Sequence, residues 1–533
     1  FILLFLRLIY LQLIKGEEYR RLSETNCIRL KSIKSSRGLI YDRNRILLVD
    51  NRPAFDLSIV LEDARPLEET LEKLGPLIQV PSAELKENIA KAGRAAFYKP
   101  VPLKRDISRD QLAVVEAHKF DLPGIQIEIE PTRHYIHPKT ASHLLGYLGK
   151  INRKELESGK YPNVKPQDSI GRYGVEKSFE SYLQGKRGGR QVEVDVNGRV
   201  IKELKRVEPV AGNDLYLSLD LTLQQLAEKM LEGQQGAVVA MDPSNGDVLV
   251  MASVPGFDQN DFIGGISSKK WRALMEHPGR PMNNKAIQAE YPPASTYKII
   301  TSLAALEEKV IDKTTTFFCP GFYKFGNRRY HCWSKHGHGE LSVVDALAQS
   351  CDVFYYQAGE KLGVDKLAQY AKGCGLGRRT GIDLDHEKKG LVPTSEWKKN
   401  RFKEPWQAGE TLSISIGQGF NLVTPLQMAS FIAAVGNGGT LYKPRIVTSI
   451  VDNEGRVIKE IEPEVIGGLP AGKNSLDLVR QGLFKVVQGN RGTARRIQIK
   501  GVDISGKTGT AQVFSRKKGE KFDNEKLARE LQD

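Results

Sequence analysis

The chain has 533 residues, enough for several domains and a substantial hydrophobic core. Hydrophobic residues make up 40% and charged residues 27% of it, which excludes disorder of the whole chain. The net charge of +15 favours anionic partners such as an acidic polymer or an anionic lipid surface. Nucleic acid is not predicted as a partner, because no basic run is interleaved with aromatic residues.

Residues 1–14 predict the end of a transmembrane signal anchor. They read FILLFLRLIYLQLI and are apolar except for Arg7 and Gln12. A spanning helix needs about 20 residues, so we expect this one to be partial, completed by residues that precede the initial Phe. A buried amphipathic helix is the alternative interpretation.

Residues 15–205 predict an α+β domain that contains no pairing of a nucleophile with a base. Alternating apolar positions predict strands within 37–60 and 125–145. Charged amphipathic patterns predict helices within 64–120. A short helix, a Gly-rich turn and two strands are expected over 171–204. The segment KRVEPVAGN that follows is typical of a linker, so the second domain is predicted to span 206–533.

The second domain begins with a predicted strand at 214–220 and a helix at 221–234. Two strands over 236–253 are joined by a Pro-Ser-Asn-Gly turn. Helices are expected around 298–306, over 343–363 and over 424–439, and a late strand over 501–513. A sheet with helices inserted between its strands indicates an α+β fold, a helical cluster against an antiparallel sheet.

A serine and a lysine three residues apart suggest a nucleophile with its base. On a helix the hydroxyl of Ser295 and the amine of Lys298 share one face. A serine hydroxyl is a poor nucleophile at neutral pH, and a desolvated lysine can remove its proton. Pro292 and Pro293 precede the serine and would fix the start of the helix.

Two further motifs follow in order. The second is Ser350-Cys-Asp352, and the third is Lys507-Thr-Gly-Thr510. Gly509 would let a ligand approach the backbone, and the N–H groups of Thr510 and Ser295 would form an oxyanion hole. Each motif alone arises by chance, but the ordered set indicates acyl transfer through a serine.

With these motifs the sequence resembles the penicillin-binding protein and serine β-lactamase superfamily. The segments RGLIYDRN (37–44), GVEKSFESYLQGKRG (174–188), GAVVAMDPSNGDVLVMAS (236–253) and SIGQG (415–419) are similar to class B penicillin-binding proteins of the elongation type. The resemblance implies a β-lactamase/transpeptidase-like domain carried by an elongated pedestal, the dimerisation domain of this family. It also implies that further strands and a helix follow the third motif, so we expect the C-terminus to be truncated.

The resemblance implies a peptidoglycan D,D-transpeptidase that cross-links stem peptides during cell elongation and is inhibited covalently by β-lactams. Ser295 would attack the penultimate D-alanine of a pentapeptide stem, Lys298 would take its proton, and Ser350 would relay a proton with help from Lys507. Lys507 and Thr508 or Thr510, beside Gly509, would hold the terminal carboxylate. No organic cofactor is implied.

Membrane partners also follow from the resemblance. They are a SEDS-type glycan polymerase and other proteins of the elongation complex. The chain would cross the bacterial cytoplasmic membrane once, with its catalytic domain on the extracytoplasmic side.

Asp352 departs from the usual second motif, which ends in Asn. A carboxylate cannot donate the hydrogen bond that an amide gives to a substrate carbonyl. Asp352 is therefore expected to pair with Lys298 or Lys507, and direct contact with the substrate is in doubt. The resemblance marks the Asp as typical of the elongation subtype.

Three of the five cysteines and a histidine lie between the nucleophile and the end of the second motif. Cys319, Cys332, His338 and Cys351 form a ligand set suited to tetrahedral Zn²⁺, and some elongation-type relatives carry zinc near this place. Their spacings of 13, 6 and 13 are not those of a compact finger. His331 and His336 are competing ligands, and a disulfide between Cys319 and Cys332 or free buried thiols are the alternatives. Cys27 and Cys374 are expected to be inert.

Two other functions use the same motifs. In a D,D-carboxypeptidase or a β-lactamase, water replaces the acceptor amine, but the length of the chain and its large first domain argue against both. A β-lactam sensor would not need the pedestal, and the intact Ser295, Lys298 and Lys507 argue against a non-catalytic scaffold.

Overall fold

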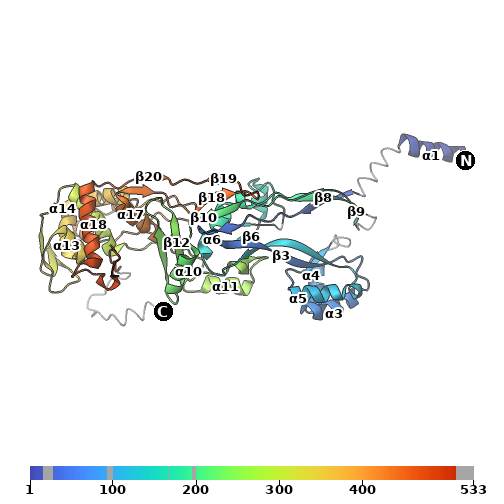
Figure 1. The fold of residues 1–533 in the computed structure, drawn as a ribbon, viewed down its shortest axis with the longest axis horizontal. Helices are drawn as coiled ribbons and strands as arrows, with labels where there is room; N and C mark the ends of the chain where they lie inside the picture. Colours follow the sequence, from blue (N-terminus) through green and yellow to red (C-terminus); the bar gives the residue numbers. More distant parts are fainter. Residues whose placement is uncertain (16–27, 93–99, 167, 195–199, 512–533) are drawn as a thin grey trace.

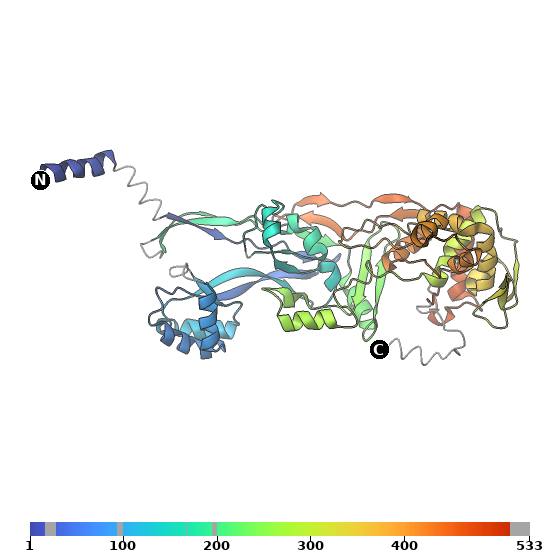
Figure 2. The same cartoon turned by 180° about the vertical axis from the view of Figure 1, so that it is seen from behind.

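The computed structural model describes residues 1–15, 28–92, 100–166, 168–194 and 200–511. This described part is elongated (Figures 1 and 2). Helices α3, α4 and α5 of the N-terminal half lie toward one end, helices α13, α14 and α18 lie at the other, and strands connect the two (Figure 1).

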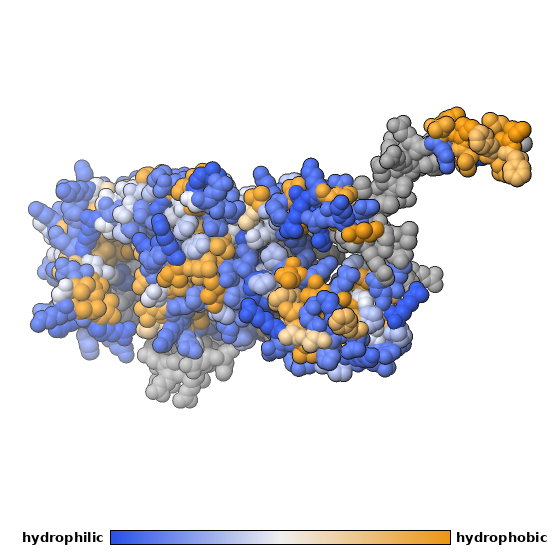
Figure 3. Space-filling model, turned by 45° about the vertical axis from the view of Figure 1, so that its right-hand side comes forward, coloured by the Kyte–Doolittle hydropathy of each residue, from blue (hydrophilic) through white to orange (hydrophobic). Residues whose placement is uncertain are grey.

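The N-terminal residues form helix α1 (Ile2–Ile9), which continues as a π-helix, η1 (Tyr10–Ile14). Its surface is almost entirely apolar (Figure 3), and Phe5 and Leu13 are 65% and 76% exposed. Among the described residues, no helix is both long enough and apolar enough to cross a membrane.

The middle of the molecule is a seven-stranded sheet of order β19-β18-β10-β2-β3-β4, with β5 also paired to β3. Strand β2 runs parallel to β10, with Ile40 opposite Leu215. Residues from both halves of the sequence therefore build one sheet. Its strands are β2 (Ile40–Tyr41), β3 (Leu47–Ile59), β4 (Val101–Lys104), β5 (Ile125–Tyr135), β10 (Asp214–Leu217), β18 (Val447–Val451) and β19 (Val457–Glu460).

Three helices pack on the outer end of β3, β4 and β5 and enclose a core of their own. The centre of this core is formed by Leu71, Leu74 and Leu85, all fully buried. The helix α5 begins at a capping box, in which Ser108 and Gln111 satisfy each other's backbone N–H groups. The helices are α3 (Leu67–Ile78), α4 (Ser82–Ala92) and α5 (Arg109–Ala117), followed by the turn η3 (Lys119–Asp121).

A second, three-stranded sheet of order β1-β8-β9 lies nearer the N-terminus, beside short helices. Its strands are β1 (Ile28–Ile33), β8 (Gly188–Val194) and β9 (Val200–Val207). The connecting elements are α6 (Ser142–Leu145), β6 (Leu148–Lys150), α7 (Arg153–Glu157), β7 (Ser169–Gly171), α8 (Gly174–Ser178) and α9 (Glu180–Leu183).

A buried ion network joins these elements. The carboxylate of Glu176, which is fully buried, accepts hydrogen bonds from Arg37 and Arg133, both at 2.6 Å. Arg37 also donates to Glu180. Both arginines keep the pKa of Glu176 below its usual value although burial opposes this. The segments 37–44 and 174–188 are thus tied together by charge.

The C-terminal half has a hairpin of β11 (Gly236–Met241) and β12 (Val248–Val254) next to a helical cluster. Its core surrounds α12, whose side chains from Lys298 to Ala305 are all buried. The expected α+β class is confirmed. The helices are α10 (Leu221–Met230), α11 (Ser268–Glu276), α12 (Lys298–Glu307), α13 (Val343–Ala348), α14 (Asp352–Gly373), α15 (Ser395–Phe402), α16 (Ala408–Ser415), α17 (Pro425–Asn437) and α18 (Lys473–Gln488).

Smaller elements complete this half. They are the turns η4 (Gln259–Phe262), η5 (Ala294–Tyr297) and η6 (Arg495–Ile497), and the strands β13 (Phe317–Cys319), β14 (Phe322–Phe325), β15 (Arg328–His331), β16 (Gly339–Leu341), β17 (Thr440–Tyr442) and β20 (Val465–Gly468).

Two local predictions were wrong. The helix expected over 343–363 is broken at the second motif, where Ser350 has a φ of 51° and separates α13 from α14. The strand expected over 501–513 is not formed in its described part, residues 501–511, although this segment lies beside the nucleophile turn.

Candidate active site

Ser295 lies on the single turn η5, and Lys298 is the first residue of α12. Residues three apart on a 3-10 turn lie above one another, so the hydroxyl and the amine face the same side. The turn is entered through Ala294, whose φ of 51° is uncommon for a residue with a side chain. The backbone is thus bent sharply just before the serine, which remains half-buried.

Lys298 is completely buried and points at the second motif. Its Nζ donates to the carbonyl oxygen of Ser350 at 2.9 Å and to Oδ1 of Asp352 at 2.6 Å. The hydroxyl of Ser350 lies 3.2 Å from the same nitrogen. Asp352 is the first residue of helix α14, and this position holds its carboxylate at the edge of the site. The expected pairing of Asp352 with Lys298 is present.

Lys507 reaches the same serine from the third motif. Its Nζ lies 2.8 Å from Oγ of Ser350, which therefore stands between two lysine amines. Burial, and to a smaller extent the charge of Lys298, lower the pKa of Lys507 to about 7, while Asp352 opposes the shift. The hydroxyl of Ser350 is within hydrogen-bond distance of both amines.

Gly509 lies against the nucleophile turn. A Cβ at this position would stand 3.3 Å from the carbonyl oxygen of Pro293. The carbonyl of Thr510 accepts a hydrogen bond from the side chain of Gln418 at 3.2 Å. The third motif therefore runs next to Ser295, as an oxyanion hole made from Thr510 and Ser295 requires.

Two contributors were not predicted from the sequence. The backbone N–H of Trp333 donates to Asp352 at 3.1 Å, and its indole N–H donates to the carbonyl of Ser350 at 3.0 Å. Thr493 binds the carbonyl of Ala348 through its N–H, and its hydroxyl lies 2.9 Å from that of Thr508. Trp333 follows a predicted metal ligand directly, which was a usable signal, whereas Thr493 carries no motif.

The four predicted metal ligands come together beneath the second motif. The donor atoms of Cys319, Cys332, His338 and Cys351 all lie within 4.8 Å of one another. Nδ1 of His338 is 3.6 Å from Sγ of Cys319 and 3.5 Å from Sγ of Cys332. Tetrahedral Zn²⁺ with its usual bond lengths separates a sulfur and a nitrogen ligand by about 3.6 Å, so the set fits this ion.

The chemistry of the cluster agrees with metal binding. The Cys351 thiol donates to Cys332, which lowers the pKa of Cys332 far below that of a free thiol and raises the pKa of Cys351. The side chains of the competing ligands His331 and His336 are exposed. Cys319, Cys332, Cys351 and Cys374 are all free, so the alternative disulfide is not formed. Cys27 lies outside the described residues.

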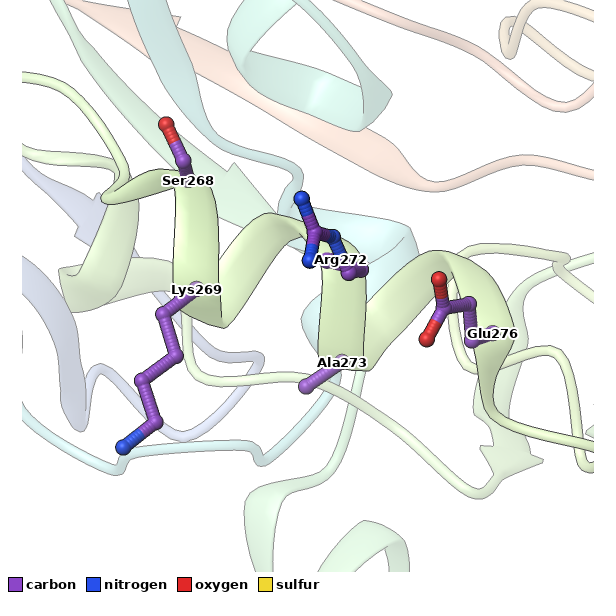
Figure 4. A pocket seen from close by; sticks show the side chains of 5 residues that line it. All are labelled: Ser268, Lys269, Arg272, Ala273 and Glu276. Atoms are coloured by element: carbon purple, nitrogen blue, oxygen red, sulfur yellow. The ribbon is translucent and has the colours of Figure 1, made fainter.

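Two hollows on the surface differ in the residues that line them. One of about 420 Å³ lies along α11 and is lined by Ser268, Lys269, Arg272, Ala273 and Glu276, all from that one helix. Ser268 and Lys269 point in opposite directions there, so no polar groups converge (Figure 4). The other, of about 360 Å³, adjoins the second motif and is lined by Trp333, Ser334, Gly337, His338, Gln349 and Arg491.

Comparison with protein families agrees with this geometry. Residues 236–529 match the penicillin binding protein transpeptidase domain, and residues 32–217 match the penicillin-binding protein dimerisation domain. The chain therefore belongs to the penicillin-binding proteins that combine a dimerisation domain with a transpeptidase domain.

Within this family the chain is similar to the elongation-type enzymes. It is 36% identical to the peptidoglycan D,D-transpeptidase MrdA of Escherichia coli K12, over 98% of this chain and 84% of the relative. The MrdA of Haemophilus influenzae is 35% identical, over 99% and 82%. The resemblance to the elongation type is thereby confirmed.

Solved structures that are similar to this chain agree with its membership of the family. The PBP2 of Helicobacter pylori in its complex with MreC matches with a TM-score of 0.80 and 30% identity, covering 91% of this chain and 89% of that one. A structure described as a peptidoglycan synthase complex that coordinates polymerization and crosslinking matches with a TM-score of 0.74 and 34% identity, covering 96% and 86%.

Proposed function

We propose that this chain is a peptidoglycan D,D-transpeptidase of cell elongation that works through an acyl-enzyme on Ser295. The observation that carries the proposal is the position of Ser350, whose hydroxyl lies 3.2 Å from Nζ of Lys298 and 2.8 Å from Nζ of Lys507. Segments far apart in sequence thus bring a candidate base and a candidate proton relay together, and Ser295, the proposed nucleophile, lies three residues before Lys298.

The proposed reaction has two balanced steps. In the first, Ser295 Oγ bonds to the carbonyl carbon of the penultimate D-alanine, and the bond to the last D-alanine breaks. The serine proton passes through Lys298 and Ser350 to the leaving amine. In the second, an amine of a neighbouring stem bonds to the same carbon and the ester bond breaks. The proton that this amine loses returns to the oxygen of Ser295.

Charge would guide the donor into the site. Lys507 is the lysine of the third motif, and its amine lies at Ser350. Its ammonium form attracts the terminal carboxylate of a D-Ala-D-Ala stem, and we assign the carboxylate to Lys507 and Thr510. A β-lactam, which also carries a carboxylate beside an acyl group, would follow the same route and acylate Ser295.

Zn²⁺ on Cys319, Cys332, His338 and Cys351 is part of the proposal as a structural ion. A closed set of four ligands leaves no position for water, so the ion would supply rigidity and not hydrolysis. Cys351 lies between Ser350 and Asp352, and Trp333 follows Cys332. Anchoring these two sulfurs would fix the direction of the second motif.

The proposed setting is the outer face of the bacterial cytoplasmic membrane, with α1 as the end of a single anchor. The exposed apolar surface of α1 supports this placement. A SEDS-type polymerase and MreC-like proteins are proposed partners, since the similar structures include a PBP2–MreC complex and a peptidoglycan synthase complex. The domain boundary near 205 and the roles of the site residues belong to the same proposal.

The test is covalent labelling with a fluorescent penicillin, read by intact mass. The protein should gain one penicilloyl adduct, and Ser295→Ala should remove it without loss of folded structure. Lys298→Ala should slow acylation by about 10²-fold or more, the usual scale for losing a general base. Labelling that persists in folded Ser295→Ala would refute the assignment.

A further inference from the structure

We propose that Trp333 is a positioning residue for acylation, because it binds both of the groups that hold the amine of Lys298. Its indole N–H donates to the carbonyl of Ser350, and its backbone N–H donates to the carboxylate of Asp352. The inference rests on the proposed function, in which Lys298 takes the proton of Ser295. It assigns a task in the reaction to a residue that lies outside the three motifs.

The contacts of the Lys298 amine are the first argument. Its Nζ lies 2.9 Å from the carbonyl oxygen of Ser350 and 2.6 Å from Oδ1 of the Asp352 carboxylate. Both oxygens can only accept hydrogen bonds. A neutral amine has two N–H groups and one electron pair, so these two oxygens take both of its N–H groups. The electron pair is then left for a hydroxyl, as a base that activates a serine requires.

Trp333 fixes the two acceptors from the other side. Its indole N–H lies 3.0 Å from the same carbonyl oxygen of Ser350, and its backbone N–H lies 3.1 Å from Oδ2 of Asp352. Oδ1 of the carboxylate thus stays with Lys298. A shift of either acceptor would turn the amine of Lys298 and move its electron pair. One residue therefore sets the direction in which the base accepts a proton.

The backbone at Ser350 depends on such support. Its φ of 51° is uncommon for a residue with a side chain. A conformation of this kind persists only where the surrounding structure holds it. The carbonyl of Ser350 is bound by both Lys298 and Trp333, and the indole N–H also lies 3.1 Å from the carbonyl oxygen of Gln349. The indole thus binds the chain on both sides of the break.

Trp333 is itself held in place by its neighbours. It follows strand β15, whose last residue, His331, accepts a hydrogen bond from the hydroxyl of Tyr356 on α14 at 3.2 Å. The indole ring meets the ring of His338 edge-on, with the ring centroids 5.2 Å apart. Although Trp333 is 61% exposed, its N–H is directed at the second motif. The donor is therefore presented from a fixed position.

The experiment separates the N–H of Trp333 from its ring. Labelling of the full chain at increasing concentrations of a fluorescent penicillin gives the dissociation constant of the non-covalent complex and the rate constant of acylation. Trp333→Phe keeps an aromatic ring and removes the donor. It should lower the acylation rate constant about tenfold, the scale of one lost hydrogen bond, and leave the dissociation constant unchanged. Because most of the ring is exposed, the variant should fold.

Trp333→His is the conservative variant. The five-membered ring of histidine can place its Nε2–H where the indole places its N–H, so this variant keeps the donor and loses the benzene ring. Its acylation rate constant should lie above that of Trp333→Phe. If Trp333 acted only through packing, phenylalanine would be the better replacement. That reverse order of the two rate constants would overturn the proposal.

Trp406→Phe is the matched control. The indole N–H of Trp406 donates to the hydroxyl of Thr411 at 2.9 Å, outside the three motifs. The control loses the same kind of hydrogen bond and should be acylated at the wild-type rate. An equal fall in Trp406→Phe, or a wild-type rate constant in Trp333→Phe, would show that the indole N–H does not position the base.

Failure of the proposed function would look different. If the wild type acquires no penicillin adduct on Ser295, both proposals fall. If the wild type is acylated on Ser295 and the rate constant does not depend on the indole N–H of Trp333, only the positioning role falls.

Discussion

Ser350 is held between two lysine amines, and Asp352 controls the charge around both. Its carboxylate binds Lys298 directly and also favours the charged form of Lys507. An Asn at position 352 would keep the shape and remove this charge. The structure thus pairs Asp352 with Lys298, while its action through the lysines rather than by contact with the substrate stays a prediction.

Asp352→Asn should lower the pKa of Lys507 below its value of about 7. The carboxylate stabilises the ammonium form, so its removal favours the neutral amine and the proton leaves at lower pH. If the ammonium holds the carboxylate of the ligand, the fall in penicillin acylation rate on the alkaline side should move to lower pH.

The measurement is the pH dependence of the second-order acylation rate constant. Asp477→Asn, at a half-buried residue on α18, removes the same charge away from the site and should not move the profile. If the alkaline side of the profile does not move in Asp352→Asn, the Lys507 ammonium does not bind the carboxylate of the ligand.

Gly417 packs directly against the turn that carries Ser295. Its carbonyl accepts the N–H of Ala294 at 2.9 Å, and its φ is 74°. A Cβ would stand 2.1 Å from the carbonyl oxygen of Ala294 and 2.6 Å from Cβ of Tyr297. Gly417→Ala should therefore lower the free energy of unfolding by about 2 kcal/mol or more and slow acylation, because the turn must move.

Gly436→Ala is the matched control. This glycine lies in α17, and a Cβ there meets no atom within 4 Å. Alanine in a helix is neutral or stabilising, so the control should unfold at the same or a higher denaturant concentration. Equal behaviour of the two variants in urea unfolding and in penicillin labelling would contradict the proposed contact.

At the scale of elements, the sequence predicted most helices and hairpins but not the breaks that present the site. The helix over 343–363 is continuous in its apolar pattern, yet it is interrupted where Ser350 adopts a positive φ. Tertiary contacts from Lys298 and Trp333 hold this break, and local propensity cannot show them. The grouping of Cys319, Cys332, His338 and Cys351 could be predicted, because these residue types are the usual ligands of zinc.

The second motif lies against the segment that carries Cys332 and Trp333, next to the proposed zinc ligands. Protein purified without added metal should contain about one zinc per chain, with all five thiols free under denaturing, non-reducing conditions. Because binding of deprotonated thiols is linked to folding, a chelator should lower the melting temperature and slow acylation together. Cys319→Ser should lose the zinc, whereas Cys374→Ala, outside the cluster, should keep it. Absence of metal with two thiols missing would instead indicate a disulfide.

At the scale of the whole molecule, the two halves of the sequence share one sheet and one core. The N–H of Leu215 donates to Leu39 at 2.9 Å, and the N–H of Leu39 donates to Asp214 at 2.7 Å. A single buried cluster includes Ile40 and Val49 from the first half with Leu217 and Val248 from the second. Parallel pairing across such a long stretch of sequence leaves no local signal, so the shared sheet could not be predicted. The segment expected as a linker, 205–213, begins inside strand β9, which ends at Val207.

A chain that begins at Gly212 should therefore keep its chemistry and lose stability. All of the proposed catalytic groups lie beyond residue 290, so a folded fragment with an intact third motif should still be acylated by penicillin. Its strand β10 loses β2 as a partner, and the buried face of Leu215 and Leu217 becomes exposed. Its melting temperature should fall well below that of the full chain. In the full chain, Val49→Ala, which truncates a fully buried side chain of the same cluster, should cost about 1–3 kcal/mol. A fragment that melts at the same temperature as the full chain would mean that the shared sheet contributes little, and that the pedestal acts only by positioning the catalytic domain.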